Sequence, residues 1–258
     1  MSVARLAIRS IRGSNPLLLR ASAHAAFRPV RFFNASAIKL NKQTSELKSI
    51  LSKELEYEEN DSFGLESHHE AWLANSGFQV SNTDGKILAE LTKTTSEEVI
   101  HVYFDVQQVT NNAFATRDEA LSEDLDQDGL NEEDVDDYLD EAFASVNVVI
   151  EKVADRSAVG FDMALSIKNS QFSVNGITNF DSVDLALAET AEAETQRQLK
   201  YTGPLFENLA EELQESIQSY LVSRGLDEEL ADFVVAYSAY KENQEYVNWL
   251  GKLEGFFK

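Results

Sequence analysis

The sequence predicts an α+β protein in which an antiparallel sheet is flanked by one N-terminal helix and two C-terminal helices. Two observations predict this fold. Between residues 77 and 174, short runs of alternating apolar and polar residues are separated by turn signals, which is typical of consecutive hairpins. Before and after that region, apolar residues recur at three- and four-residue steps, which is typical of amphipathic helices.

The first helix is expected to begin at Ser45, whose hydroxyl is a good N-cap, and to end between Asn60 and Gly64. Its apolar residues form a single stripe that needs a packing partner: Leu47, Ile50, Leu51 and Leu55.

Strands are expected next, and the first two should form a hairpin because Asn82-Thr83-Asp84-Gly85 is a strong turn signal. A second tight turn is expected at 155–157. The predicted strands are 77–81, 86–94, 99–109, 144–154 and 158–168, with shorter candidates at 171–174 and 198–201.

The end of the chain is expected to be helical. One helix should start at Gly203-Pro204 and stop at Gly225, and Asp227 should cap the next one. That last helix carries apolar side chains on two faces, which predicts two packing partners. Its second face could meet another subunit or could pack within the chain against the first helix. The residues involved in either case are Leu47, Leu51, Leu55, Tyr246, Trp249, Leu250, Leu253 and Phe256.

The charge of the chain reverses near residue 40. Residues 1–40 hold seven basic residues and no acidic ones, whereas residues 41–258 hold all 45 acidic residues and 15 basic ones. A basic, acid-free leader rich in Ser and Ala predicts a mitochondrial presequence over 1–40 and a single domain over 41–258 in the mitochondrial matrix. The alternative is a disordered basic tail. No transmembrane segment is expected, because no later stretch approaches about 20 apolar residues.

The chain has no cysteine, which excludes disulfides and thiolate chemistry. No phosphate-binding glycine loop and no nucleophile elbow is present, so the sequence offers no catalytic residue and no cofactor site. The protein is predicted not to be an enzyme, and an enzyme without a recognisable motif is the alternative. A net charge of −30 over 41–258 should repel phosphate, so nucleic acid would be contacted only indirectly. The same charge favours basic protein partners.

The densest acidic stretch is 118–141, where 13 of 24 residues are acidic and none is basic. It is predicted to be a loop insertion, spanning 111–141, between two strands. It could be a docking surface for basic partners or a solubilising insertion. The predicted partner-binding residues are Glu123, Asp124, Asp126, Asp128, Glu132, Glu133, Asp134, Asp136 and Asp137.

Within this stretch, Asp124, Asp126 and Asp128, followed by Gly129, match the first half of a calcium-binding loop. The second half fails, because the bidentate glutamate that should close the loop is Val135. These aspartates are therefore a weak metal candidate, and calcium buffering is the alternative function. Elsewhere, His68-His69-Glu70 begins like a zinc-protease helix, but Leu73 stands where the second histidine ligand is needed.

Residues near the C-terminus resemble the signature of the mitochondrial acidic matrix protein family, also called the mitochondrial glycoprotein family, whose animal member is a complement-binding protein. The resemblance is carried by Arg224-Gly225-Leu226-Asp227, Leu230-Ala231-Asp232, Gln244-Glu245-Tyr246, Trp249-Leu250, Leu253 and Phe256. The leader, the acidic insertion and the absence of cysteine agree with a fungal-type member.

This resemblance implies a ring-shaped homotrimer, each subunit having a twisted seven-stranded antiparallel sheet with the terminal helices on one side. It also implies a non-enzymatic scaffold or chaperone of the matrix. Such a protein would bind basic mitochondrial proteins, for example ribosomal or RNA-binding proteins. It would support mitochondrial ribosome assembly, translation and respiratory function, including oxidative phosphorylation.

Overall fold

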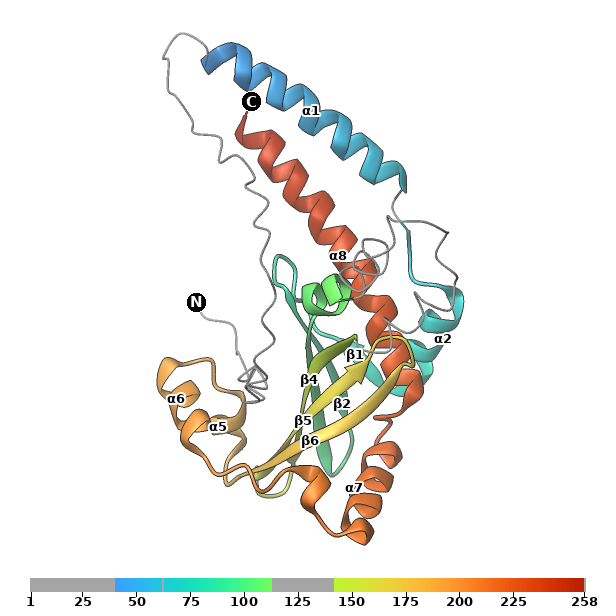
Figure 1. Ribbon diagram of the computed structural model, residues 1–258, viewed down its shortest axis with the longest axis vertical. Coiled ribbons are helices and arrows are strands. Elements are labelled where there is room, and N and C mark those ends of the chain that lie inside the picture. The colour runs from blue at the N-terminus through green and yellow to red at the C-terminus, as the bar shows by residue number, and fades with distance from the viewer. Residues whose placement is uncertain (1–39, 62, 113–141, 258) are drawn as a thin grey trace, which may run out of the picture. The chain divides into compact units, whose positions relative to one another are not determined.

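The computed structural model describes residues 40–61, 63–112 and 142–257, and these residues form an antiparallel sheet with helices before and after it (Figure 1). They divide into two compact units. One runs from residue 63 to Tyr246, and the other comprises α1 and the end of α8 from Val247. Among the described helices, none combines the length and the apolar character that a membrane span requires.

The sheet is a simple meander in which every strand pairs with its neighbour in sequence. Its strands are β1 (Phe78–Val80), β2 (Leu88–Thr94), β3 (Glu98–Asp105), β4 (Phe143–Lys152), β5 (Ala158–Ser166) and β6 (Gln171–Phe180). The register aligns Leu91, Val102, Val148 and Phe161 in one row across the sheet, and all four are buried. The alternation of apolar and polar residues in the sequence therefore determines which face of each strand packs into the main core.

The predicted turns are confirmed. Between β1 and β2, the amide of Asp84 donates to Oδ1 of Asn82 at 3.0 Å, and Gly85 has a φ of +73°. Between β4 and β5, Asp155 accepts from the amide of Ser157 at 3.0 Å. Short polar side chains that bond to backbone two residues later favour such turns, so the hairpins could be located from sequence.

The number of strands differs from the prediction. The described residues contain six strands, and the seven implied by the family resemblance are not reached within them. The candidate strand at 198–201 is wrong, because α6 (Ala191–Leu199) covers its first half and residues 200–201 belong to no strand. Thr190 caps this helix, and Nη1 of the buried Arg197 donates to the carbonyl oxygens of Leu185 and Ala188, both at 2.8 Å.

The third strand is also shorter than predicted. It ends at Asp105, and residues 106–112 are helical. Oδ1 of Asp105 accepts from the amide of Gln108 at 3.0 Å, which is the bond of a helix N-cap. Val106 and Val109 are both buried. Their three-residue spacing suits one face of a helix, whereas a strand would place them on opposite faces. Valine nevertheless favours strands, which is why a longer strand was predicted.

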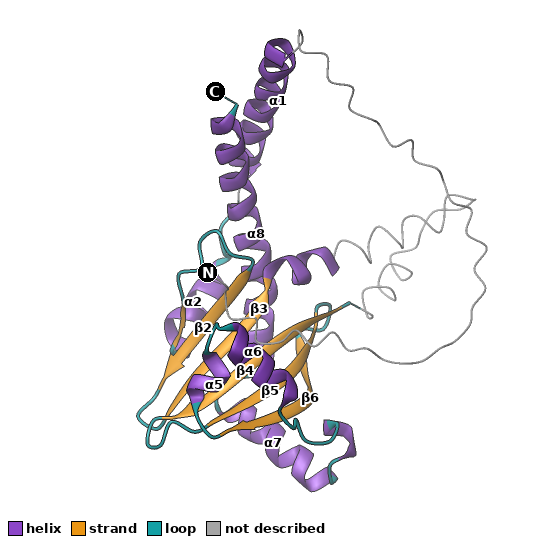
Figure 2. Cartoon of the chain, turned by 90° about the vertical axis from the view of Figure 1, so that its left-hand side faces the viewer, coloured by secondary structure: helices purple, strands orange, loops and turns teal. Residues whose placement is uncertain are grey.

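One face of the sheet carries the main core. It is covered by α2 (Ser67–Ser76), α7 (Glu211–Ser223) and the first part of α8 (Glu228–Phe256). The covering side chains that are most deeply buried come from α8 and include Leu230, Phe233 and Val234, all at 0% exposure. The other face meets α5 (Val183–Leu187), whose Val183 and Ala186 pack with Tyr103, Val149 and Phe180. Figure 2 shows α5 and α6 in front of the sheet and α7 behind it.

The two C-terminal helices exist, but the first begins later than predicted. Residues 206–208 form a short 3₁₀ turn (η1, Phe206–Asn208) in which Phe206 is buried, and α7 starts only at Glu211. Nε2 of Gln214 donates to the carbonyl oxygens of Glu207 and Leu209, which satisfies backbone groups of the non-helical segment. Gly225, with a φ of +88°, ends α7 as predicted, and Asp227 Oδ1 accepts from the amide of Leu230 in α8.

The second unit pairs α1 (Leu40–Asp61) with the end of α8. α1 begins at Leu40, so Ser45 lies inside the helix and is not its cap. No proline or glycine stands between residues 40 and 45 to stop the helix there. Oγ of Ser52 donates to Oε1 of Glu254 at 2.8 Å, and Leu51 and Leu250 are buried.

Candidate functional site

The acidic stretch that the sequence marks for partner binding, residues 118–141, lies outside the described residues. The same is true of the half calcium loop at Asp124, Asp126 and Asp128. The unit spanning 63–246 has exposed acids and cavities of its own.

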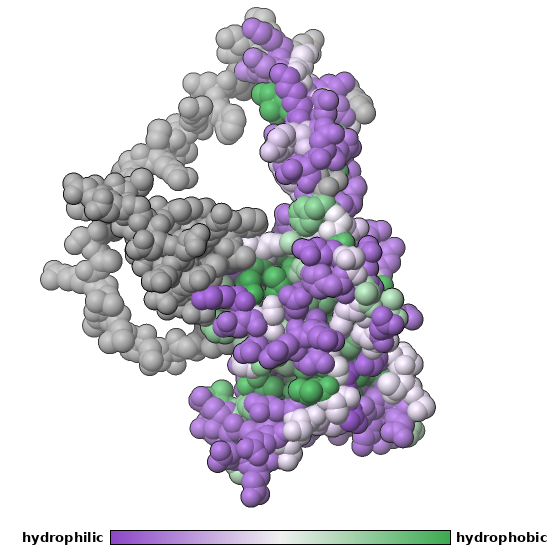
Figure 3. Space-filling view, turned by 90° about the vertical axis from the view of Figure 1, so that its right-hand side faces the viewer, coloured by the Kyte–Doolittle hydropathy of each residue, from purple (hydrophilic) through white to green (hydrophobic). Residues whose placement is uncertain are grey.

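A groove of about 630 Å³ lies between the sheet and the two C-terminal helices. Its floor is apolar and comes from β5, β6 and α7, with Met163, Phe172, Val174 and Leu221 among its lining residues. This volume falls in the range of sites that hold a small molecule or a few side chains of a partner. Figure 3 shows one face of the molecule, on which hydrophilic residues predominate and small hydrophobic areas lie between them.

The rim of the groove is acidic at the start of α8. Asp227, Glu228 and Glu229 line it, and the side chain of Gln171 in β6 donates to Oε1 of Glu228 at 3.2 Å. Carboxylates are favoured here because the first turn of a helix presents unpaired N–H groups and the positive end of the helix dipole. An apolar floor next to three carboxylates suits a partner segment that carries apolar and basic side chains together.

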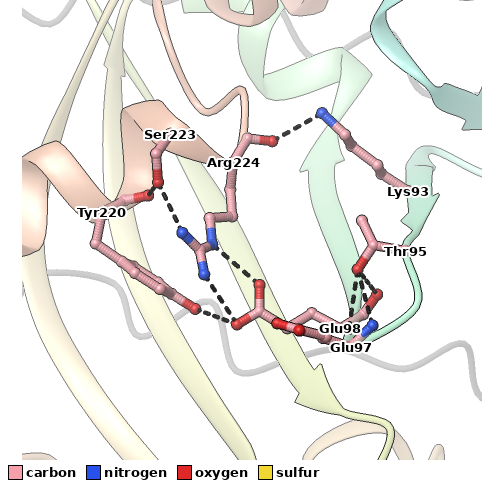
Figure 4. A network of polar contacts seen from close by, with 7 residues as sticks. All are labelled: Lys93, Thr95, Glu97, Glu98, Tyr220, Ser223 and Arg224. Atoms are coloured by element: carbon pink, nitrogen blue, oxygen red, sulfur yellow. Dashed lines mark hydrogen bonds and ion pairs between the residues drawn. The ribbon is translucent and has the colours of Figure 1, made fainter.

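A network of polar contacts holds the end of α7 against the start of β3 (Figure 4). The carboxylate of Glu98 accepts from Nε of Arg224 at 3.0 Å, from Nη2 of Arg224 at 3.3 Å and from the hydroxyl of Tyr220 at 3.0 Å. The guanidinium of Arg224 also lies 4.1 Å from the centre of the Tyr220 ring. A two-pronged ion pair with a stacked aromatic ring fixes geometry well, so this network positions the α7 side of the groove.

The adjoining backbone is tied to the sheet as well. Nζ of Lys93 in β2 donates to the carbonyl oxygen of Arg224 at 3.0 Å. That oxygen is one of those that a helix leaves unpaired at its C-terminal end, and Lys93 satisfies it. The hydrogen bond from Arg224 holds the pKa of Glu98 below its ordinary value.

We expect Glu98→Gln to lower the free energy of unfolding by about 1–3 kcal/mol at neutral pH, because a partly buried arginine loses its charged acceptor. Since the pKa of Glu98 is lowered on folding, its carboxylate stabilises the fold above the ordinary value of 4.5. That contribution is lost as the pH falls through the lower folded pKa. Urea unfolding of both proteins at pH 7 and at about pH 3 measures it.

The matched control is Glu97→Gln, because Glu97 is exposed and adjacent in sequence. This variant should change stability by less than about 0.5 kcal/mol. A deficit of Glu98→Gln that is equally large at both pH values would show that the charge of the carboxylate is not what stabilises the network.

A second polar cluster lies on the opposite face of the sheet. Oε1 of Glu90 accepts from the hydroxyl of Tyr103 at 2.9 Å and lies 3.1 Å from Nδ1 of His101. The His101 contact lowers the pKa of Glu90, and burial raises the pKa of Tyr103. These shifts keep the carboxylate charged and the phenol neutral, an arrangement that ties β2 to β3.

The residues predicted for packing or assembly differ widely in exposure. Leu51 and Leu250 are buried, Leu55, Tyr246 and Leu253 are partly buried, and Leu47 is more exposed, at 39%. Trp249 is 54% exposed and Phe256 is 80% exposed. The last helix therefore has one buried stripe and one open apolar stripe.

The family model described as Mitochondrial glycoprotein (MAM33) matches residues 51–257 of this chain. The chain belongs to the mitochondrial glycoprotein family. It is 28% identical to the mitochondrial acidic protein mam33 of Schizosaccharomyces pombe over 236 residues, which cover 88% of this chain and 85% of that protein. Both matches identify a mitochondrial acidic protein, consistent with the matrix.

Solved structures support the fold. A Leishmania major protein, described as a sequence homologue of human p32, has a TM-score of 0.62 and 25% identity. The match covers 84% of this chain and 99% of that one. The p22 protein of Trypanosoma brucei has a TM-score of 0.60 and 22% identity, covering 84% and 100% of the two chains.

The residues that carried the family resemblance in the sequence have structural roles in this member of the mitochondrial glycoprotein family. Arg224 binds Glu98, Gly225 supplies the left-handed turn, and Asp227 caps α8. Leu226 and Leu230 are buried in the main core. Sequence reasoning found these positions but could not assign the partner of Arg224, since Glu98 lies 126 residues away.

Proposed function

We propose that the protein is a non-enzymatic acidic scaffold or chaperone of the mitochondrial matrix that binds basic proteins. Through such clients, ribosomal or RNA-binding proteins among them, it supports mitochondrial ribosome assembly, translation and respiratory function. The observation that carries the proposal is the excess of 45 acidic over 15 basic residues in 41–258. A surface of one sign attracts partners of the opposite sign over long range and speeds their association.

Two regions are proposed to receive these clients. The acidic stretch, residues 118–141, supplies most of the attraction because it has the highest density of carboxylates in the chain. The groove between β5, β6, α7 and α8 supplies selectivity for particular side chains, because its apolar floor lies beside Asp227, Glu228 and Glu229. A basic segment held by charge alone would exchange quickly, and an apolar side chain in the groove would slow its release.

The test is to purify the protein from mitochondria at low salt, with and without ribonuclease, and to identify what co-purifies. Basic ribosomal proteins that persist after ribonuclease and leave at high salt are expected, because exposed charge pairs are screened by salt. Clients that are lost after ribonuclease treatment would be bound to this protein through RNA. Recovery of no basic protein would contradict the proposal.

We also propose that the protein is a homotrimer in which one face of the end of α8 lies at or beside subunit contacts. This face carries the exposed Trp249 and Phe256 and the partly buried Leu253. An apolar stripe that stays exposed in a single chain is typical of an assembly surface. The competing arrangement is packing against Leu47, Leu51 and Leu55 of the same chain.

Trp249→Ala is expected to dissociate the assembly at concentrations where the wild-type protein stays together, because the indole would be lost from a buried contact. Sedimentation velocity over a dilution series, together with circular dichroism, measures both effects. A variant that unfolds without first dissociating would favour packing within the chain.

A further inference from the structure

Three potential metal-ligating side chains meet where α2 approaches α8, and both segments belong to the unit spanning 63–246. His68 and His69 lie in the first turn of α2, and Asp232 lies near the start of α8. One ligand atom from each of the three lies within 4.8 Å of the others. The two imidazole rings are tilted by 40° with their centres 3.7 Å apart, so consecutive residues face the same carboxylate.

The distances are close to those between ligands of one metal ion. Nε2 of His69 is 2.9 Å from Oδ2 of Asp232, and Nε2 of His68 is 3.7 Å from the same oxygen. Zinc binds imidazole nitrogen and carboxylate oxygen at about 2.0–2.2 Å, which places the ligands of a tetrahedral site roughly 3.4 Å apart. The two observed distances lie on either side of that value, so shifts of a few tenths of an ångström would accommodate an ion.

The surroundings of both histidines suit metal binding through Nε2. Oε2 of Glu66 lies 3.5 Å from Nδ1 of His68, which favours a proton on Nδ1 and leaves the Nε2 lone pair for an ion. A carboxylate behind a histidine ligand is a common arrangement in metal sites. His69 is 7% exposed, and within the described part of the chain its Nδ1 has no hydrogen-bond partner. In the metal-free protein Nε2 of His69 donates its proton to Oδ2 of Asp232, so a bound ion would take the place of that proton.

We infer that His68, His69 and Asp232 form a binding site for a divalent transition-metal ion, with Zn²⁺ as the best-matched ion. Two imidazoles and one carboxylate are ligands that zinc accepts, whereas calcium and magnesium prefer oxygen alone. His68 and Asp232 are largely exposed and His69 is buried, so an ion would bind at the surface with a coordination position open to solvent. Such an ion would crosslink α2 to α8.

The test uses the full chain without a histidine tag. Zn²⁺ should bind with a stoichiometry of one high-affinity site per chain in calorimetry and should raise the unfolding temperature, because it binds the folded state preferentially. Co²⁺ should give visible absorption bands that Zn²⁺ removes. His68→Ala and Asp232→Asn should each weaken this site by about tenfold to a hundredfold.

Glu70→Gln is the matched control, because Glu70 is an exposed residue of the same helix and is not one of the three ligands. It should leave the affinity unchanged. His68→Ala should also leave the stability of the metal-free protein unchanged, because His68 is exposed, so its effect reports on binding and not on folding. Binding that survives both ligand variants would assign the ion to other carboxylates of the chain. The absence of a high-affinity site would leave the His69–Asp232 contact as a hydrogen bond between two helices. Either result overturns the inference.

Discussion

Replacing Phe233 by alanine is expected to lower the free energy of unfolding by about 3–5 kcal/mol, which is the usual cost of removing a fully buried phenylalanine. Phe233 is 0% exposed and lies on the face of α8 that covers the sheet. Its ring centre is 4.7 Å from that of Trp72 and 5.6 Å from that of Tyr237. Truncation would therefore remove contacts among α2, α8 and the main core at once. Urea unfolding followed by circular dichroism measures the loss.

Leu199→Ala is the control, because Leu199 lies in the same unit and is 82% exposed. Its effect should stay within about 0.5 kcal/mol. A loss below about 1 kcal/mol for Phe233→Ala would mean that the surrounding aromatic rings close the cavity, and that α8 does not depend on this side chain for its place on the sheet.

Neutralising the acidic stretch is expected to slow the association of a lysine-rich peptide by about tenfold or more at low salt, since clusters of like charge raise association rates by about that factor. The variant replaces eight acids by their amides: Asp124, Asp126, Asp128, Glu132, Glu133, Asp134, Asp136 and Asp137. Stopped-flow fluorescence over a series of salt concentrations measures the rate. The difference from wild type should vanish at about 1 M salt, where the screening length is about 3 Å.

A second variant with the same net charge separates position from total charge. It replaces eight exposed acids outside both the stretch and the groove: Glu56, Glu59, Glu189, Glu192, Glu207, Glu211, Glu212 and Glu215. We expect it to lose less, because these carboxylates are spread over several elements. Equal losses would show that the total charge of the body attracts clients, and an unchanged rate in the first variant would remove the stretch from the mechanism.

The elements that could be predicted from sequence are those whose signals are local. The turn at 82–85 depends on a side-chain bond over two residues, and the end of α7 depends on one glycine with a positive φ. The apolar stripe of α8 and the alternation in β3 to β5 likewise reflect a single period within one segment. Family membership was recognised from the same C-terminal segment, and the family model confirms it.

The candidate sites could not be predicted in the same way, because each joins distant segments. The groove combines residues of β5 and β6 with residues of α7 and α8, about 50 positions later in the chain. The carboxylate that contacts His69 belongs to Asp232, 163 residues later in the chain. A sequence motif relates only residues a few positions apart and could not identify this pair. The end of β3 at Asp105 was missed for another reason, since Val106 and Val109 are residues that favour strands and here lie on one face of a helix.

The order of the strands has a consequence for how the chain folds during its synthesis. Each strand pairs with the one before it, so the sheet can form one hairpin at a time, starting from its amino-terminal strand. The side chains that seal its main apolar face, Leu221 to Val234, come more than 40 residues after the last strand. Until these side chains are in place, a nearly complete sheet would have only α2 over part of its main hydrophobic face. That state is the one most exposed to aggregation during biogenesis.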